Sequence, residues 1–183
     1  IDRMDGARLS LQVPRDEGPV MYMDRPWEGR WCGYYTVIKD GETFKLYYRG
    51  KPGPGNAGEP DEVTCYAESP DGIEWTRPSL GLVEVNGTRE NNVVLGPKSP
   101  PVRHNFTPFL DTRPGVDESE RFKALGGLFD HGTREATTHG LLLYASADGI
   151  HWRQHRGEAV INQSHRNSLY TDTSSNPAFW SES

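Results

Sequence analysis

The stretch SPDGIEW, residues 69–75, returns 77 residues further on as SADGIHW, residues 146–152. Both copies keep a serine, an aspartate, a glycine and a tryptophan at the same spacing. Serine and aspartate oxygens accept backbone N–H bonds inside a tight turn, glycine takes a positive φ, and tryptophan folds back onto a sheet. We interpret the pair as one structural corner used twice. The alternative, that Asp71 and Asp148 are paired catalytic acids, is disfavoured because equivalent corners in successive units keep them apart.

The same order of elements precedes each corner. Aromatic and β-branched residues separated by turn signals predict three strands before each one. The predicted strands lie in the stretches 32–50, which holds two strands around an Asp40-Gly41 turn, 62–69, 104–111, 121–129 and 140–146. Phe44 precedes Ser69 by 25 residues and Phe122 precedes Ser146 by 24, so the register is kept. A repeat of roughly 70 to 80 residues is typical of four-stranded propeller blades with long loops.

A third unit is predicted to begin near the end of the sequence. In DTSSNPAFWSES, residues 172–183, Phe179 and Trp180 stand where Phe109 and Leu110 stand in the second unit. We therefore expect an all-β protein, with about two propeller blades and the first strand of a third in this chain. The predicted divisions are a lead-in segment at 1–26, a first blade with its connection at 27–98, a second blade at 99–165 and the start of a third at 166–183. Two blades cannot close a ring, so their sheet edges need further blades or other copies of the chain.

Composition excludes several classes of partner. The chain has 26 acidic and 20 basic residues, a formal net charge of −6 and no basic stripe, so nucleic acid is not expected to bind. No run of 18 apolar residues is present, so no membrane partner is expected. Two cysteines make no disulfide framework. His131 and His139 are eight residues apart, which is no metal-ligand spacing, and we predict neither a metal nor a cofactor.

Longer strings carry a resemblance to a known group of enzymes. The stretch CYAESPDGIEWTRPSLGLVEVNGTRENNVVL (65–95), followed by HNFTPFLDTRP (104–114) and ERFKALGG (120–127), resembles bacterial proteins related to glycoside hydrolase families 32 and 43. The resemblance runs from about Trp27 to Trp180. It implies a five-bladed β-propeller whose active site lies at the axial end of the innermost strands and takes one acid from each of three successive blades. It also implies a fructan, arabinan or related oligosaccharide as substrate, and it favours a secreted or periplasmic location.

The sequence departs from the family pattern where the catalytic acids would lie. The Asn-Asp-Pro stretch of family 32 is absent, and the first inner strand reads WCGYYTV (31–37) without a carboxylate. Asp111, in FLDTRP, is a loose match to the Arg-Asp-Pro stretch of the second blade. Because glycosidic cleavage uses two carboxyl groups, the chain need not hold a complete site. A non-catalytic glycan-binding or structural propeller remains the alternative.

The predicted site residues come from the ends of the inner strands, with Asp111 closing the strand that His104 and Asn105 open, and from the loop before the first blade. The predicted catalytic residues are Asp111 and Asp172. The predicted substrate-binding residues are Trp27, Glu28, Trp31, His104, Asn105 and Asn176. Each also has a structural interpretation: the 23–31 loop suits a surface ion-pair cluster, His104 and Asn105 suit a buried polar pair, and Asp111 suits a turn cap. If the functional interpretation holds, His104, Asn105 and Asp172 converge on one concavity.

Overall fold

The computed structural model describes residue 6 and residues 10–56, 61–96, 106–126, 140–155 and 161–162. Its regular structure is antiparallel β-sheet, with one short 3₁₀ turn, Glu118–Glu120, and no α-helix within those ranges. No helix there is long and apolar enough to cross a membrane. The all-β class is therefore confirmed. The predicted strand at the start of the third unit lies outside the described residues.

The first sheet is a meander of four strands in the order β1-β2-β3-β4. The strands are β1 (Gly33–Asp40), β2 (Thr43–Gly50), β3 (Val63–Ser69) and β4 (Val93–Leu95). The Asp40-Gly41 turn predicted from the sequence closes the first hairpin, and Gly41 has φ of +59°. Phe44 of β2 lies directly opposite Ser69 of β3, so the first corner begins where the sheet ends.

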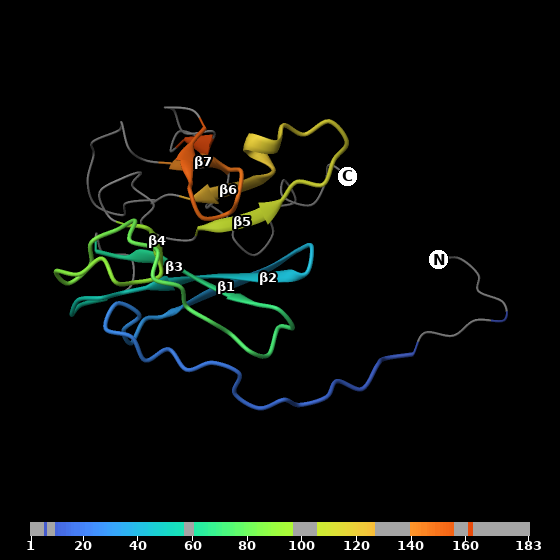
Figure 1. The fold of residues 1–183 in the computed structure, drawn as a ribbon, viewed down its shortest axis with the longest axis horizontal. Coiled ribbons are helices and arrows are strands. Elements are labelled where there is room, and N and C mark those ends of the chain that lie inside the picture. Colours follow the sequence, from blue (N-terminus) through green and yellow to red (C-terminus); the bar gives the residue numbers. More distant parts are fainter. Residues whose placement is uncertain are drawn as a thin grey trace.

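The second sheet repeats this meander above the first (Figure 1). Its strands are β5 (Thr107–Leu110), β6 (Phe122–Gly126), β7 (Gly140–Ser146), β8 (Arg153–Gln154) and β9 (Ile161–Asn162). Phe122 lies opposite Ser146, as Phe44 lies opposite Ser69, so the sequence register is also the structural register. The first strands of the two sheets, β1 and β5, are in contact.

The fourth strand of each sheet is split into two pieces. In the first sheet, Thr76 bridges to Glu68 just after the corner, and Leu95 of β4 pairs with Thr64 much later. In the second sheet, β8 pairs with β7 just after the corner and β9 pairs with the beginning of β7. Sequence patterns did not indicate this split, because the short pieces carry little periodicity of their own.

The first corner is closed by the oxygens of Ser69 and Asp71. Ser69 Oγ accepts hydrogen bonds from the backbone N–H groups of Asp71 (3.2 Å) and Gly72 (2.8 Å). Asp71 Oδ1 accepts from the N–H groups of Ile73 and Glu74, both at 2.8 Å. Gly72 has φ of +81°, which explains the glycine at this place.

The second corner has the same bonds. Ser146 Oγ accepts from Asp148 N–H (3.3 Å) and Gly149 N–H (2.9 Å), and Asp148 Oδ1 accepts from the two following N–H groups at 2.8 Å. The tryptophan indole N–H donates to the glycine carbonyl at 2.9 Å in each corner. The predicted structural role of the turn is therefore confirmed. Trp152 is buried, whereas Trp75 is half-buried.

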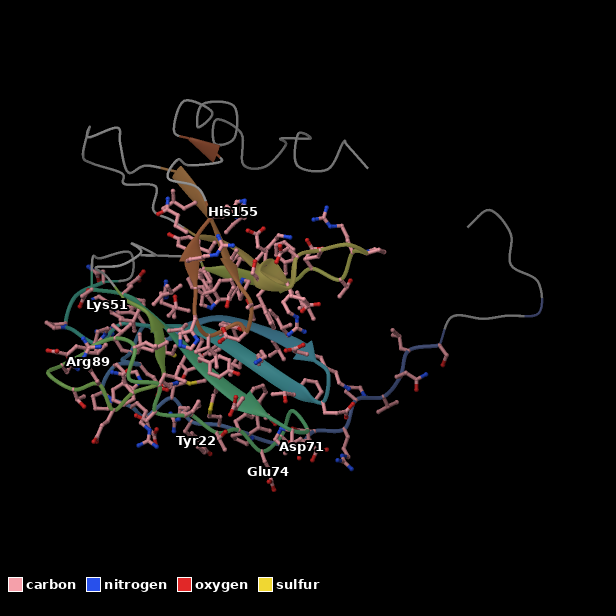
Figure 2. All side chains as sticks on the ribbon, turned by 45° about the horizontal axis from the view of Figure 1, so that its top comes forward. Tyr22, Lys51, Asp71, Glu74, Arg89 and His155 are labelled. Carbon is pink, nitrogen blue, oxygen red and sulfur yellow. The ribbon has the colours of Figure 1, made fainter. Side chains whose placement is uncertain are left out.

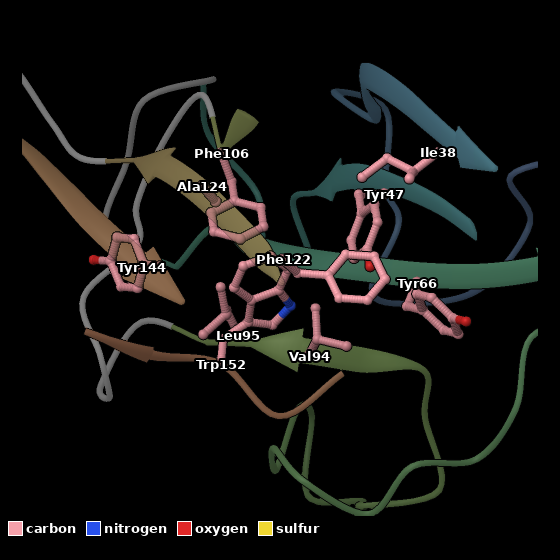
Figure 3. Packing of buried hydrophobic residues seen from close by; sticks show 10 residues of the cluster. All are labelled: Ile38, Tyr47, Tyr66, Val94, Leu95, Phe106, Phe122, Ala124, Tyr144 and Trp152. Carbon is pink, nitrogen blue, oxygen red and sulfur yellow. The ribbon is translucent and has the colours of Figure 1, made fainter. Parts of the chain in front are cut away.

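The main core lies between the two sheets (Figure 3). Its buried members are Ile38, Tyr47, Tyr66, Val94, Leu95, Phe106, Phe122, Ala124, Tyr144 and Trp152. Tyr47 of the first sheet lies edge-on to Trp152 of the second, with ring centroids 6.0 Å apart, and its hydroxyl donates to the Gly149 carbonyl at 2.8 Å. The second corner therefore joins its own sheet to the first sheet.

A second core covers the opposite face of the first sheet. Buried Leu46, Tyr48 and Cys65 pack there against Met21, Met23 and other residues of the segment before β1. In Figure 1 this segment runs along the lower sheet on the side away from the upper sheet. The proposed lead-in at 1–26 thus includes residues that pack on the first sheet, and the predicted domain divisions stay predictions.

Candidate functional site

The β1 strand begins with a bulge that displays two tyrosines. Gly33 pairs with Arg49, but regular pairing resumes only at Thr36. Tyr34 has φ of +56°, a conformation that costs a bulky residue about 1–3 kcal/mol. Tyr34 and Tyr35 are each 54% exposed. Strained residues and bulges are over-represented next to functional sites, so the start of β1 is the candidate functional site.

Trp31 adds a third aromatic side chain at this end of β1. Its indole N–H donates to the Gly55 carbonyl at 2.9 Å, which fixes the half-buried ring. The guanidinium of Arg30 lies 5.0 Å from the centre of the ring. We refer to Trp31, Tyr34 and Tyr35 as the aromatic surface.

Arg49 of β2 contacts two members of the aromatic surface, Trp31 and Tyr34. Its Nε and Nη2 atoms donate to the Trp31 carbonyl at 3.0 and 2.8 Å, and its guanidinium carbon lies 4.5 Å from the centre of the Tyr34 ring. Nη1 lies 3.6 Å from Oε1 of the buried Glu62. A single, partly buried cation therefore fixes the Trp31 backbone and the Tyr34 ring relative to one another.

Lys51 closes the same end of the sheet (Figure 2). Its side chain is buried, and Nζ donates to Asp61 Oδ2 at 2.7 Å and to the Pro54 carbonyl at 2.8 Å. The loop after β2 is thereby tied to the start of β3. Since Trp31 donates to Gly55 of this loop, Lys51 also stabilises the place of the indole.

Tyr35 donates a hydrogen bond to the Cys32 sulfur at 3.8 Å. Burial and, to a lesser extent, the hydrogen bond to Cys32 together raise the pKa of Tyr35 to about 12. Burial also raises the pKa of the Cys32 thiol. Both groups are therefore neutral near pH 7, and Tyr35 is available as a neutral phenol with an apolar ring.

Glu28, predicted to bind substrate, lies in a closed polar network. Its side chain is fully buried. Its carboxylate accepts from Tyr48 (2.7 Å), from Arg77 (2.9 and 3.0 Å) and from the Arg25 backbone N–H (2.8 Å). Trp27 is joined to the same network, because its indole N–H donates to Asn92 at 2.7 Å and Asn92 donates to Tyr48 at 2.8 Å. Both side chains are thus engaged within the protein.

Asp111, predicted to be catalytic, follows the last residue of β5. Its carboxylate accepts from Arg113 at 2.9 and 2.6 Å and from Lys123 at 2.6 Å. The hydrogen bonds from Arg113 and then from Lys123 hold the pKa of Asp111 well below its usual range. Arg121, whose carbonyl accepts from the Asp111 N–H, forms an ion pair with Asp40 at the end of β1. Asp111 therefore lies where β1 and β5 end.

The structure places the predicted residues in two separate regions. Trp27, Glu28 and Trp31 precede β1, whereas Asp111 lies at the opposite end of the inner strands, so these residues do not form one cluster. The remaining predicted residues lie outside the described ranges, and their convergence stays a prediction. They are His104, Asn105, Asp172 and Asn176.

Sequence reasoning missed Tyr34, Tyr35 and Arg49. Tyr34 and Tyr35 were assigned to an ordinary strand, yet a glycine directly before two aromatic residues in a strand can mark a bulge. No local signal distinguishes Arg49, because its contacts with Trp31 and Glu62 cross between strands.

No protein-family model matches this chain, and no curated protein matches it.

Proposed function

We propose that this chain supplies a sugar-binding part of a carbohydrate-active β-propeller of the glycoside hydrolase class. The single observation that carries the proposal is the aromatic surface, in which Tyr34 and Tyr35 are half exposed while Arg49 binds the Trp31 carbonyl and lies against the Tyr34 ring. Sugar rings bind through apolar faces to aromatic side chains and through hydroxyl groups to a few fixed polar atoms. Two half-exposed phenols and an indole offer both kinds of contact.

The two sheets are proposed to be successive blades of a five-bladed propeller. Each is a four-stranded meander, each ends its third strand in the same corner, and their first strands are in contact. In a propeller the first strands surround the axis. Arg121 forms an ion pair with Asp40 and accepts a hydrogen bond from the Asp111 N–H, so β1 and β5 end on the same side of the two sheets. The two strands therefore also begin on a common side, opposite to that one. The proposed sugar site is at the edge where they begin.

Hydrolysis needs two carboxyl groups on either side of the scissile bond. In this proposal Asp172, at the predicted start of the third inner strand, is one of them, while His104, Asn105 and Asn176 bind hydroxyl groups. Trp27 and Glu28 then act by supporting the loop that carries Trp31. Asp111, which lies at the other end of β5, is a weaker candidate for catalysis than Asp172.

A non-catalytic glycan-binding propeller is the second candidate, and one observation favours it. The acidic residues nearest the aromatic surface are already paired with cations: Glu28 with Arg77, Glu62 with Arg49 and Asp61 with Lys51. A carboxylate that serves as nucleophile or general acid has to reach the substrate. Within the described part of the chain, this surface is therefore better equipped for binding than for cleavage.

Calorimetric titration with fructo- and arabino-oligosaccharides, together with an assay of released reducing ends, separates the two candidates. Release of sugar that Asp172→Asn abolishes supports the hydrolase, and binding without release supports the glycan-binding protein. Tyr35→Ala should weaken binding at least about tenfold in both cases, as expected when a central aromatic contact is lost. Tyr22→Ala, at an exposed tyrosine on the segment before β1, is the matched control and should bind as wild type does. Equal binding by the Tyr35→Ala and Tyr22→Ala variants would refute a sugar site at the aromatic surface.

A further inference from the structure

The contact between the two sheets shows how one repeat receives the next. On the first sheet, the contacting face includes Ile38, Lys45 and Tyr47. On the second sheet, Phe122 and the Gly149–Trp152 corner pack against this face. Lys45 Nζ lies 5.7 Å from the centre of the Phe122 ring. A Cβ atom on Gly149 would collide with the Tyr47 hydroxyl, so the fit at the corner is tight.

The second sheet carries an equivalent face on its far side. Ile38 pairs with Lys45 in the first sheet, and Phe109 pairs with Lys123 in the second. In the same way, Leu125 stands at the place of Tyr47. Ile38 is 8% exposed, but Phe109 is 48% exposed, and Leu125 is half-buried. We call Phe109, Lys123 and Leu125 the open face.

The first corner is the counterpart of the second corner, but it lacks the contacts that the second one makes. Nothing lies within 4 Å of a Cβ atom built on Gly72, in contrast to Gly149. Ile73 is 38% exposed, whereas its equivalent Ile150 packs against the core between the sheets. Figure 2 places Asp71 and Glu74 at the margin of the first sheet that is turned away from the second sheet. We call residues 70–74 the open corner.

We propose that the open corner of one chain docks on the open face of a second copy of the same chain. The contact would repeat the one already present between the two sheets, with Ile73 against Phe109 and Leu125. The exposed Asp71 and Glu74 would lie near Lys123 and the half-exposed Arg153, whose partners within their own sheet are Asp111 and Glu120. The two surfaces differ from one another, so the association is head to tail. The inference does not depend on sugar binding.

Sedimentation velocity of the 183-residue chain tests the proposal through two variants. Wild type should gain mass reversibly over roughly a hundredfold range of concentration, as mass action requires. Phe109→Asp removes the open face and Ile73→Asp removes the open corner, so each variant alone should stay monomeric. A mixture of the two should form a one-to-one dimer, since each supplies the surface that the other lacks. Val13→Asp, at a 94% exposed residue of the leading segment, should associate as wild type does.

Several outcomes would overturn the proposal. These are a wild-type chain that stays monomeric throughout the range, a variant that associates alone as wild type does, and a mixture that stays monomeric while wild type associates. The last outcome would indicate a symmetric interface instead. Circular dichroism melting of both variants verifies that the exposed substitutions leave the fold intact.

Discussion

At the scale of single residues, Tyr34 has a strained backbone that lowers stability and an exposed ring that is proposed to bind sugar. Its φ of +56° suits glycine and not tyrosine, yet the side chain lies over Arg49 and is half exposed. A residue kept in an unfavourable conformation at an exposed place is better explained by what its side chain binds than by what it adds to folding.

Replacement of Tyr34 by glycine should therefore uncouple the two properties. Tyr34→Gly relieves the strain and should leave the free energy of unfolding unchanged or raise it by up to about 1 kcal/mol, while the proposed binding of sugar weakens. Tyr34→Ala loses the ring and keeps the strain, so it should bind as poorly and be less stable than Tyr34→Gly. Urea unfolding of the three proteins measures the difference. Lower stability of the glycine variant than of the alanine variant would contradict this account.

Asp111 should make stability depend on pH. Arg113 and Lys123 lower the pKa of Asp111 in the folded protein, and the unfolded value is about 3.9. A carboxyl group with a lowered folded pKa contributes stability that is fully present above the unfolded pKa and is lost as the pH falls towards the folded pKa. Between pH 5 and pH 3, on the order of one unit to either side of that value, the urea midpoint of wild type should therefore fall more steeply than that of Asp111→Asn. Parallel pH profiles of the two proteins would show that Asp111 does not form this ion pair in solution.

At the scale of elements, the two corners form a matched pair in different surroundings. Their hydrogen bonds agree within 0.1 Å for each donor and acceptor pair, from 2.8 to 3.3 Å. Local sequence therefore determines the turn. The burial of the tryptophan is not local, because Trp152 lies between two sheets and Trp75 lies at the margin of one.

Alanine substitution at the two tryptophans should reveal that difference. Trp152→Ala should cost about 3–5 kcal/mol, since it opens a cavity in the main core. Trp75→Ala should cost about half as much, because the ring is already half exposed. Guanidinium unfolding of the two variants provides the comparison. Equal losses at both places would mean that the first corner is as closely packed as the second.

At the scale of the whole molecule, a few contacts join the sheets into one unit. The Tyr47 hydroxyl crosses from β2 to the second corner and donates to a buried carbonyl at 2.8 Å. Tyr144 lies in the same core, but its buried hydroxyl has no hydrogen-bond partner within the described residues. The two phenols thus offer a comparison of the same chemical group with and without a bond.

Tyr47→Phe should destabilise the protein by about 0.5–1.5 kcal/mol, because the Gly149 carbonyl loses one of its two donors and keeps only the Trp152 indole N–H. Tyr144→Phe should be neutral or slightly stabilising, since it removes a buried hydroxyl that makes no bond. Thermal unfolding followed by near-ultraviolet circular dichroism measures both effects. An equal loss of stability in the two variants would show that the hydroxyl of Tyr47 does not join the sheets.

The sequence by itself determined the features that depend on local chemistry. The two S-x-D-G-x-x-W corners, the Asp40-Gly41 turn and the strands before each corner follow from turn residues and β-forming runs a few residues long. Phe44 pairs with Ser69, and Phe122 pairs with Ser146. This register was predictable because the two residues of each pair are separated by nearly the same number of residues in both repeats. These elements were predictable because their causes lie within each segment.

Only the tertiary structure decided which side chains meet across strands. In the sequence, Glu28 has arginines nearby and Tyr34 lies in an aromatic run. Either pattern is compatible with a sugar site or with contacts inside the protein. The structure pairs Glu28 with Arg77, 49 residues away. It leaves Tyr34 half exposed over Arg49 and Tyr35 half exposed beside Tyr48. Which residues far apart in the sequence pair with each other depends on how the sheets twist and pack. Twisting and packing join segments that share no local sequence pattern. Their outcome therefore appears only once the chain is folded.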